Sequence, residues 1–236
     1  MVQVGDIPGL GPETYSRWRA SAVGAITDTL QRRLIFELLG DVRGRSVLDV
    51  GCGDGELAVE LWKRGANVTG IDASREMIEA ARSRARRERA EIEFSVADAG
   101  DIPFASERFD IVAAVTILCF VENAAPVFTE VARVLRPGGR LVIGELGKWS
   151  SWAATRRIRA WLGSRLWRRG RFRTAGELRG LAAQAGLVTG PVRGAVYYPR
   201  LQLLARLLAR WDATLSRFTT VGAAFLALSA AKPSDS

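Results

Sequence analysis

The residues of this sequence that are best suited to bind a ligand lie in a glycine-rich turn. The apolar segment 47–50 runs into Gly-Cys-Gly-Asp-Gly at 51–55, and apolar residues at helical spacing follow from Leu57. Glycine lets the backbone turn tightly, and it lets a ligand approach main-chain atoms that a Cβ would shield. A strand, a glycine-rich turn and a helix in this order predict a nucleoside-binding site.

Two acidic residues accompany this turn. Asp49 lies two positions before the first glycine, and Asp72 closes the apolar segment 67–72. A carboxylate at the second position can accept hydrogen bonds from both hydroxyls of a ribose. The glycine spacing is G-x-G-x-G, whereas dinucleotide sites need G-x-G-x-x-G, so a nicotinamide-dependent dehydrogenase is a distant alternative. A tight strand-to-helix turn without a ligand is the structural alternative.

Hydrophobic patterning predicts the elements that position these residues. Strands are expected near 46–50, 67–72, 92–97, 109–115 and 140–145, and helices near 55–64, 75–88 and 124–134. Alternating strands and helices are typical of a parallel sheet wrapped by helices. Pro137-Gly138-Gly139 is expected to end the last of these helices and turn the chain into the fifth strand.

The rest of the chain is expected to complete one domain over 1–236. Thr174 and Glu177 predict a capping box for a helix that ends before Gly186. Further elements are predicted at 187–197 (strand), 201–215 (helix) and 220–231 (strand), after a loose arm at 1–12 and a helix over 15–39. Ligands bind beyond the carboxyl ends of parallel strands. Three segments are therefore expected to cover the substrate edge: an N-terminal helical cap (1–40), an insertion (147–173) and a helical insertion (198–219).

Residues 45–146 resemble the core of the class I S-adenosylmethionine-dependent methyltransferases, in the small-molecule branch that includes quinone-biosynthesis enzymes. The matching motifs are Val47–Gly55, Val68–Ser74, Val96–Phe104, Phe109–Val112 and Leu135–Ile143. The resemblance implies a doubly wound α/β fold with a mostly parallel, seven-stranded, Rossmann-like sheet and helices on both faces. It also implies that the last strand is antiparallel and lies between the fifth and sixth, and that the cofactor is S-adenosyl-L-methionine.

The resemblance also implies roles for individual residues. The residues expected at the cofactor are Asp49, Gly51, Cys52, Gly53 and Gly55 beside its amino-acid half, Asp72 at its ribose, Ala73, Ser74 and Met77 beside adenosine, Asp98 and Ala99 at adenine, and Thr116 near the methionine portion. For Cys52 a purely structural role between two glycines is preferred. Met77 has the alternative of a core residue, and Thr116 that of a strand-end hydroxyl bonded to backbone. No metal site is expected.

A catalytic base is harder to assign, because the sequence has no histidine. A hydroxyl or an acidic carbon as methyl acceptor would need a base. The candidates are Glu122, Glu145, Tyr15, Tyr197 and Tyr198. Glu145 and Tyr15 are retained as weak candidates, Glu145 because it ends the fifth strand at the ligand edge. Its alternative is a charge pair with a neighbouring arginine, and the catalytic residue stays unknown.

The charge of this 236-residue chain is concentrated in one segment. The net charge is +9, and nine basic residues but no acidic residue lie between Lys148 and Arg173, together with four of the seven tryptophans. Such a segment suggests an anionic or interfacial partner, in particular a membrane surface. The alternative is a solvated helix whose arginine stems cover its own tryptophans. Two cysteines without metal or disulfide spacing, and the absence of an apolar run of membrane length, predict a cytoplasmic location, with possible peripheral membrane contact.

The sequence therefore predicts an enzyme that transfers a methyl group from S-adenosylmethionine to a small, apolar or aromatic acceptor. Two alternatives stay open: an RNA or protein methyltransferase that docks through 148–173, and a non-catalytic S-adenosylmethionine-binding homologue. A nucleic-acid substrate is disfavoured, because the Asn/Asp-Pro-Pro-aromatic motif and the Pro-Cys nucleophile of nucleic-acid methyltransferases are missing. The sequence makes no prediction of oligomeric state.

Overall fold

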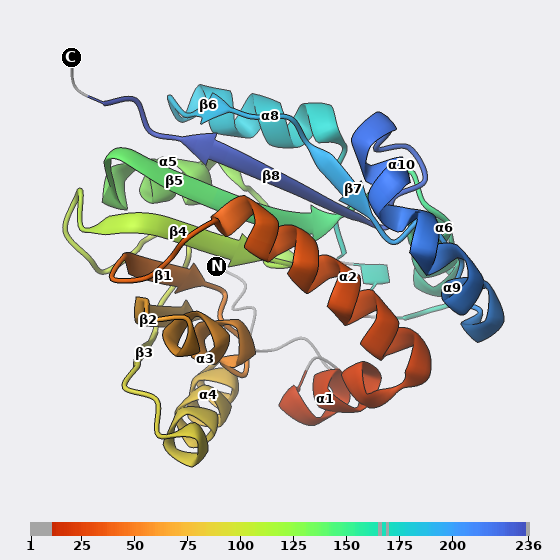
Figure 1. The fold of residues 1–236 in the computed structure, drawn as a ribbon, viewed down its shortest axis with the longest axis horizontal. Coiled ribbons are helices and arrows are strands. Elements are labelled where there is room, and N and C mark those ends of the chain that lie inside the picture. Colours follow the sequence, from red (N-terminus) through yellow and green to blue (C-terminus); the bar gives the residue numbers. More distant parts are fainter. Residues whose placement is uncertain (1–10, 165–166, 169, 235–236) are drawn as a thin grey trace.

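The central element of the fold is a mixed β-sheet (Figure 1). The computed structural model describes residues 11–234 except 165–166 and 169, and leaves the side chain of Tyr15 undescribed. The strands are β1 (Ser46–Val50), β2 (Asn67–Asp72), β3 (Glu93–Val96), β4 (Phe109–Val115), β5 (Leu135–Leu146), β6 (Val188–Thr189), β7 (Arg193–Ala195) and β8 (Phe225–Ala231). Their order is β3-β2-β1-β4-β5-β8-β6, with β7 also paired to β8.

The predicted topology of the sheet is confirmed. Strands β1 to β5 are parallel to one another, and β8 runs antiparallel between β5 and β6. The described sheet has eight strands instead of seven, because the predicted sixth strand at 187–197 is two short strands on either side of Gly190-Pro191. Proline has no N–H to donate to a ladder, so the pairing is interrupted there.

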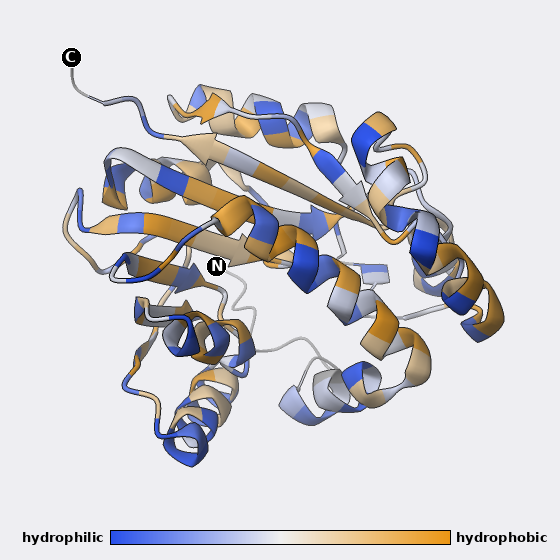
Figure 2. Ribbon diagram, viewed as in Figure 1, coloured by the Kyte–Doolittle hydropathy of each residue, from blue (hydrophilic) through white to orange (hydrophobic). Residues whose placement is uncertain are grey.

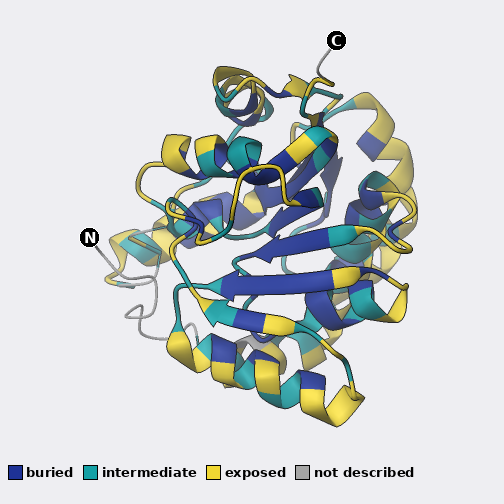
Figure 3. Cartoon of the chain, turned by 90° about the vertical axis from the view of Figure 1, so that its left-hand side faces the viewer, coloured by how far each residue is buried: buried dark blue, intermediate teal, exposed yellow. Residues whose placement is uncertain are grey.

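Helices pack on both faces of the sheet. They are α1 (Pro12–Ala20), α2 (Ala22–Leu39), α3 (Glu56–Lys63), α4 (Arg75–Glu88), α5 (Ala125–Val134), α6 (Ser151–Trp161), α8 (Ala175–Gln184), α9 (Gln202–Leu208) and α10 (Asp212–Phe218), with short 3-10 turns η2 (Leu118–Phe120) and η3 (Ala209–Trp211). α2, α3 and α4 share one core with alternate residues of the strands, and α5 and α8 share the other. The central strands are mainly hydrophobic (Figure 2) and buried between the helices (Figure 3).

The N-terminal segment forms two helices, so the single helix predicted over 15–39 is wrong. The chain breaks at Ser21, whose side chain accepts a hydrogen bond from the N–H of Gly24 and caps α2. A Cβ on Gly24 would lie 1.9 Å from the carbonyl oxygen of Trp18, so glycine is required where the two helices cross. The break lets α1 fold back beside the start of α4, as the contacts of α1 with both α2 and α4 show.

The boundaries of three further elements also differ from the prediction. The helix predicted over 201–215 is divided into α9, η3 and α10, and the final strand begins at Phe225 instead of residue 220. The fifth strand begins at Leu135, so Pro137-Gly138-Gly139 lies inside β5 near its pairing irregularity with β4. The predicted capping box is present, since Thr174 and Glu177 exchange side-chain and backbone hydrogen bonds at the start of α8.

Candidate active site

A cavity of about 210 Å³ lies at the carboxyl ends of β1, β2 and β4. The strand-side residues that line it are Asp49, Gly51, Cys52, Gly53, Asp54, Asp72, Ser74, Glu76, Met77, Val115, Thr116, Ile117 and Phe120. On the helical side it is lined by Gly11, Arg19, Asp28, Gln31, Arg32, Ile35, Glu56 and Leu57. Eight of the twelve residues predicted to bind the cofactor therefore share one cavity wall.

The glycine-rich turn takes a backbone conformation that favours glycine. Gly51, Gly53 and Gly55 have φ values of +70°, +54° and +77°, in the left-handed region where a Cβ is disfavoured. A Cβ on Gly51 would lie 2.7 Å from Cδ1 of Ile117, and one on Gly55 would lie 2.9 Å from Cβ of Ala81. At Gly53 no atom lies within 4 Å of that position. The backbone of Gly53 is therefore open at the cavity wall.

Asp49 brings a buried carboxyl group to this wall. It is 2% exposed, and its Oδ2 has no hydrogen-bond partner among the described residues. Burial, with a smaller contribution from the negative charge of Asp72, raises the pKa of Asp49 to about 7. An unpartnered buried oxygen is costly in a folded protein, so this group is suited to accept a hydrogen bond or a positive charge from a ligand.

Asp72 links the glycine-rich turn to the start of α4. Its two carboxylate oxygens accept hydrogen bonds from the N–H of Gly53 (3.0 Å) and of Ser74 (2.8 Å). Burial raises the pKa of Asp72, and these two backbone donors oppose the rise. Each oxygen keeps a second lone pair for a ligand hydroxyl. Ser74 caps α4 by accepting from the N–H of Met77 (3.3 Å).

Thr116 and Cys52 line the cavity. Each also has the local contacts expected for a purely structural role. Thr116 follows β4 at a φ of +55°, and its hydroxyl donates to the carbonyl of Val115 (2.8 Å). The thiol of Cys52 is buried between its glycines, and burial raises its pKa well above the ordinary value. The thiol therefore stays protonated at neutral pH.

The other predicted cofactor residues do not line the described cavity: Gly55, Ala73, Asp98 and Ala99. Gly55 begins α3 at the inner side of the turn. Asp98 is exposed, and its Oδ1 accepts from the N–H of Gly100 (2.8 Å), whereas Ala99 is 7% exposed within the second core. Their roles at adenine stay a prediction.

The candidate bases whose side chains the structure describes lie away from the cavity wall. Glu145 is fully buried beneath the loop after β4, where its carboxylate accepts from the N–H of Leu118 (2.6 Å) and of Leu146 (3.3 Å). Burial raises the pKa of Glu145 to about 7, and Arg173 contributes only a smaller opposing charge. These contacts place Glu145 as a support for the loop that carries Ile117 and Phe120.

The remaining candidates have other partners. Glu122 is exposed and lies 3.6 Å from Arg171. The hydroxyl of Tyr197 donates to the carbonyl of Thr219, and that of Tyr198 lies 3.0 Å from the hydroxyl of Thr27. Burial raises the pKa of both tyrosines to about 12. Tyr15 lies on α1, and its side chain is outside the described residues.

The helical side of the cavity carries side chains that sequence reasoning missed. Asp28, Gln31, Arg32 and Ile35 lie on one face of α2, at spacings of three, four and seven residues, and all four line the cavity. This spacing was a usable signal, because a mixed polar face beside the apolar face of the predicted helix indicates a second surface to contact. Sequence reasoning also missed the acids that pair with these helices: Asp54 in the glycine-rich turn pairs with α1, and Glu56 at the start of α3 pairs with α1 and α2.

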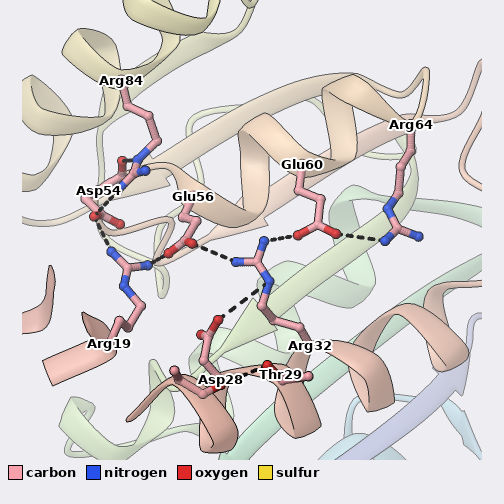
Figure 4. Close-up of polar contacts among 10 residues, drawn as sticks. Arg19, Asp28, Thr29, Arg32, Asp54, Glu56, Glu60, Arg64 and Arg84 are labelled. Atoms are coloured by element: carbon pink, nitrogen blue, oxygen red, sulfur yellow. Dashed lines mark hydrogen bonds and ion pairs between the residues drawn. The ribbon is translucent and has the colours of Figure 1, made fainter. Parts of the chain in front are cut away.

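Ion pairs fasten α1 and α2 to the glycine-rich turn and to α3 (Figure 4). Arg19 pairs with Asp54 (2.5 Å) and with Glu56, and Arg32 pairs with Glu56 (3.0 Å) and with Glu60. Arg84 of α4 shares the carboxylate of Asp54, and Arg64 shares that of Glu60. The N-terminal cap is thus held over the cavity by charge.

The two insertions contribute no described residue to this cavity. The chain leaves the carboxyl end of β5 at Leu146 and enters α6, while α9 packs beside α2. Coverage of a substrate by 147–173 and 198–219 stays a prediction.

Comparison with known proteins shows a methyltransferase domain in this chain. A family model described as a methyltransferase domain matches residues 48–143. The O-methyltransferase rstn1 of Aspergillus nomiae is 38% identical over 131 residues, which cover 54% of this chain and 58% of that protein. The demethylmenaquinone methyltransferase of Tropheryma whipplei is 40% identical over 120 residues, 51% of this chain and 49% of that protein. The chain thus spans about half the length of these curated relatives.

Two longer matches extend beyond the core segment. A Mycobacterium tuberculosis protein without a described activity is 32% identical over 226 residues, which cover 94% of this chain and 72% of that protein. A crystal structure of a SAM-dependent methyltransferase from Thermotoga maritima superposes with a TM-score of 0.70 at 23% identity, over 93% of this chain and 95% of that one. Because the family model falls on the strands and loops that form the cavity, we conclude that residues 48–143 form an S-adenosylmethionine-dependent methyltransferase domain, and nearly the whole chain shares the fold of the Thermotoga maritima enzyme.

Proposed function

We propose that this chain transfers the methyl group of S-adenosylmethionine to a small, apolar or aromatic acceptor. The observation that carries the proposal is that one cavity contains three features. These are the unpartnered buried carboxyl oxygen of Asp49, the open backbone of Gly53 and the carboxylate of Asp72. The names of the relatives support the choice of a small acceptor, since one is an O-methyltransferase and one a demethylmenaquinone methyltransferase.

The residues of the cavity fit this cofactor in charge and shape. S-adenosylmethionine supplies a methyl group on a positively charged sulfonium, attached to an amino acid and a nucleoside. Asp49 and Asp72 would offer negative charge and acceptor oxygens to the ammonium and ribose ends. A Cβ at Gly53 would fill the open space beside the backbone of the turn. The apolar side chains of Leu57, Met77 and Ile117 line the same cavity.

The main contribution of the chain to the reaction would be to place two reactants in line. Holding them close and collinear can supply up to roughly 7–11 kcal/mol of the barrier. Thr116, Ile117 and Phe120 lie on the loop after β4, which Glu145 fixes from below through the N–H of Leu118. The N-terminal cap closes the opposite side of the cavity and limits the access of water.

An acceptor that must lose a proton needs a base, and Asp28 is the described carboxyl group that lines the cavity from α2. Its nearest charge partner is Arg32, at 3.8 Å, beyond hydrogen-bond distance. Burial raises the pKa of Asp28, with Arg32 opposing the rise. Asp28 is therefore better placed as a base than Glu145.

Binding of cofactor to two glycine variants tests the proposal. We expect Gly53→Ala to weaken the binding of S-adenosylmethionine and of its demethylated product at least tenfold by calorimetry, because the new methyl group would occupy the open side of the turn. The matched control is Gly186→Ala, which also has a positive φ (+78°) and open space but lies after α8. Both variants bear a strain of about 1 kcal/mol, so their free energies of unfolding should fall alike.

Three results would count against the proposal. Wild-type protein that binds neither ligand would remove the cofactor assignment, and equal affinities of the two variants would remove the site. Binding without turnover on any small acceptor would favour the non-catalytic alternative.

The location of the protein is part of the same proposal. We place it in the cytoplasm, with peripheral contact to a membrane surface through 148–173. Both cysteines, Cys52 and Cys119, are free and buried, which suits a reducing compartment. Among the described helices none has both the length and the apolarity needed to cross a membrane.

A further inference from the structure

Exposed hydrophobic side chains are concentrated at one end of the molecule. Those with large exposed fractions include Trp149 (60%), Trp161 (86%), Leu162 (71%), Leu203 (70%), Trp211 (54%) and Phe218 (82%). Of the large hydrophobic residues that the described chain exposes, only Val96 and Val188 lie outside 149–162 and 201–221. We refer to these two segments together as the apolar end. Scattered exposed hydrophobic residues need no explanation, but such a concentration marks an interaction surface.

The elements that carry these side chains are joined to one another. The indole N–H of Trp152 on α6 donates to the carbonyl of Tyr198 (2.7 Å), and the guanidinium of Arg200 lies 5.0 Å from the Trp152 ring. The N–H of Gly222 donates to the carbonyl of Trp149 (2.8 Å). Figure 1 shows α6, α9 and α10 gathered beyond one end of the sheet, and Figure 2 shows hydrophobic and hydrophilic residues alternating along α9.

The apolar end is also strongly basic. Its two segments contain six arginines and one acidic residue, Asp212. Asp212 is buried, and its carboxylate accepts hydrogen bonds from the N–H groups of Val196 and Tyr197. Within the described part of the chain, Arg159, Arg206 and Arg217 have no carboxylate partner. The surface is therefore positively charged without local compensation.

Arginine stems cover only some of the tryptophans. The guanidinium of Arg156 lies over the rings of Trp152 and Trp167, at 5.5 and 4.6 Å, and Trp152 is almost fully buried. This part of the insertion matches the alternative of a self-covering helix. Trp161 and Phe218, with more than four-fifths of their surface exposed, do not.

We propose that the apolar end binds the surface of a membrane rich in anionic lipids. Tryptophan, leucine and phenylalanine enter the boundary between headgroups and acyl chains, and arginine pairs with anionic headgroups. A second copy of this chain is a poor occupant, because a symmetric contact would bring two uncompensated positive surfaces together. RNA is a poorer match, since phosphate contacts do not need exposed leucine and phenylalanine.

Helix α2 connects the apolar end to the cavity. Helix α2 packs beside α9 and bonds to Tyr198 through Thr27, while its other face carries Asp28 and Ile35 into the cavity. A chain lying on lipid with its apolar end would thus hold α2 near the bilayer. That an apolar acceptor is collected there rests on the proposed methyl transfer, whereas the binding to lipid does not.

Sedimentation with vesicles of stated composition tests the proposal. The full chain should bind vesicles of phosphatidylglycerol and phosphatidylcholine at low salt, and bind pure phosphatidylcholine far less. The triple variant Arg159→Gln, Arg206→Gln, Arg217→Gln should bind the anionic vesicles roughly 100-fold more weakly, given the usual contribution of each basic residue. The matched control is Arg43→Gln, Arg86→Gln, Arg87→Gln, which removes the same charge from exposed positions elsewhere and should bind as wild type.

The apolar contribution is tested separately. The double variant Leu203→Ser, Phe218→Ser should lower the bound fraction at least tenfold, whereas Val188→Ser, an exposed valine on β6, should not. Failure of the wild type to bind anionic vesicles, or equal losses in the two triple variants, would overturn the proposal. The proposal would also be overturned if the chain bound single-stranded RNA as tightly as lipid and the double variant bound that RNA as tightly as wild type. Calorimetry with S-adenosylmethionine reports separately on the proposed function, because none of these positions lines the cavity.

Discussion

At the scale of single residues, the cavity depends on carboxyl groups whose surroundings differ. Asp72 is bonded to two backbone N–H groups, Asp54 is held by two arginines, and Asp49 keeps an unpartnered oxygen. Asp28 stands apart from these, on the helical side. One kind of side chain, the carboxylate, thus supports the turn in Asp72 and anchors the cap in Asp54, and it is a proposed ligand acceptor in Asp49 and a proposed base in Asp28.

The candidate base gives a prediction at this scale. With an acceptor that must be deprotonated, Asp28→Asn should lower kcat by about 100-fold, the usual contribution of a general base, with the Kd of the cofactor changed less than threefold. Because burial raises the pKa of Asp28, the wild-type rate should rise with pH through that pKa, and the variant should lack this limb. Steady-state rates across pH check this.

Glu145→Gln is the comparison for this experiment. Glu145 bonds to backbone away from the cavity wall, so its variant should keep the acidic limb of the pH profile. Loss of that limb in Glu145→Gln, with its retention in Asp28→Asn, would return Glu145 to the role of base.

At the scale of elements, the cap and the glycine-rich turn are separate units joined by ion pairs. Arg32 of α2 bonds to Glu56 and Glu60 of α3, and all three side chains are partly shielded from solvent. Pairs in a network with restricted solvent contribute more than isolated exposed pairs. The closed position of the cap should therefore depend on this network.

Substitution of one arginine tests the closure of the cap. Arg32→Met keeps much of the length of the side chain but removes its charge, so we expect faster hydrogen exchange in α1 and α2 and a cofactor dissociation rate raised about tenfold. Arg33→Met is the control, since Arg33 is next in sequence and its carboxylate partner among the described residues is Glu37, at an exposed position of the same helix. Similar exchange rates in the two variants would mean that apolar packing alone holds the cap.

At the scale of the whole molecule, two buried acids link stability to pH. The pKa values of Asp49 and Glu145 are raised to about 7, from ordinary values of 3.8 and 4.5, chiefly by burial. Between these values the folded chain keeps protons that the unfolded chain releases. The free energy of unfolding must therefore fall as the pH rises from about 4 through 7.

Unfolding by urea at pH 5 and pH 8 measures this linkage in the cofactor-free protein. We expect wild type to be less stable at pH 8, and Glu145→Gln to lose less stability over the same interval because one of the two groups is gone. The surface variant Glu122→Gln should follow wild type. Parallel losses in all three proteins would show that Glu145 does not hold its proton in the folded state.

The predictable part of the fold is the part governed by local patterns. The strands at 46–50, 67–72 and 109–115 and the capping box at Thr174 were predicted with their observed bounds, because alternation and capping depend on near neighbours. The break at Ser21 and the division of the helix at 201–215 were not. Gly24 is required by the crossing of α1 over α2, a contact that helical periodicity does not encode.

The sequence by itself determined the methyltransferase core and the wall of the cavity that the glycine-rich turn forms, because turn chemistry and strand-end acids are local and ordered along the chain. Only the tertiary structure decided that the α2 surface with Asp28 and Arg32 lies across the cavity from this wall. It also decided that Glu145 is buried, and that leucines at 201–215, which the sequence pattern grouped into one apolar stripe, are exposed. Each of these depends on which elements meet across long sequence separations, and burial then fixes the charge state and the partners of the side chains.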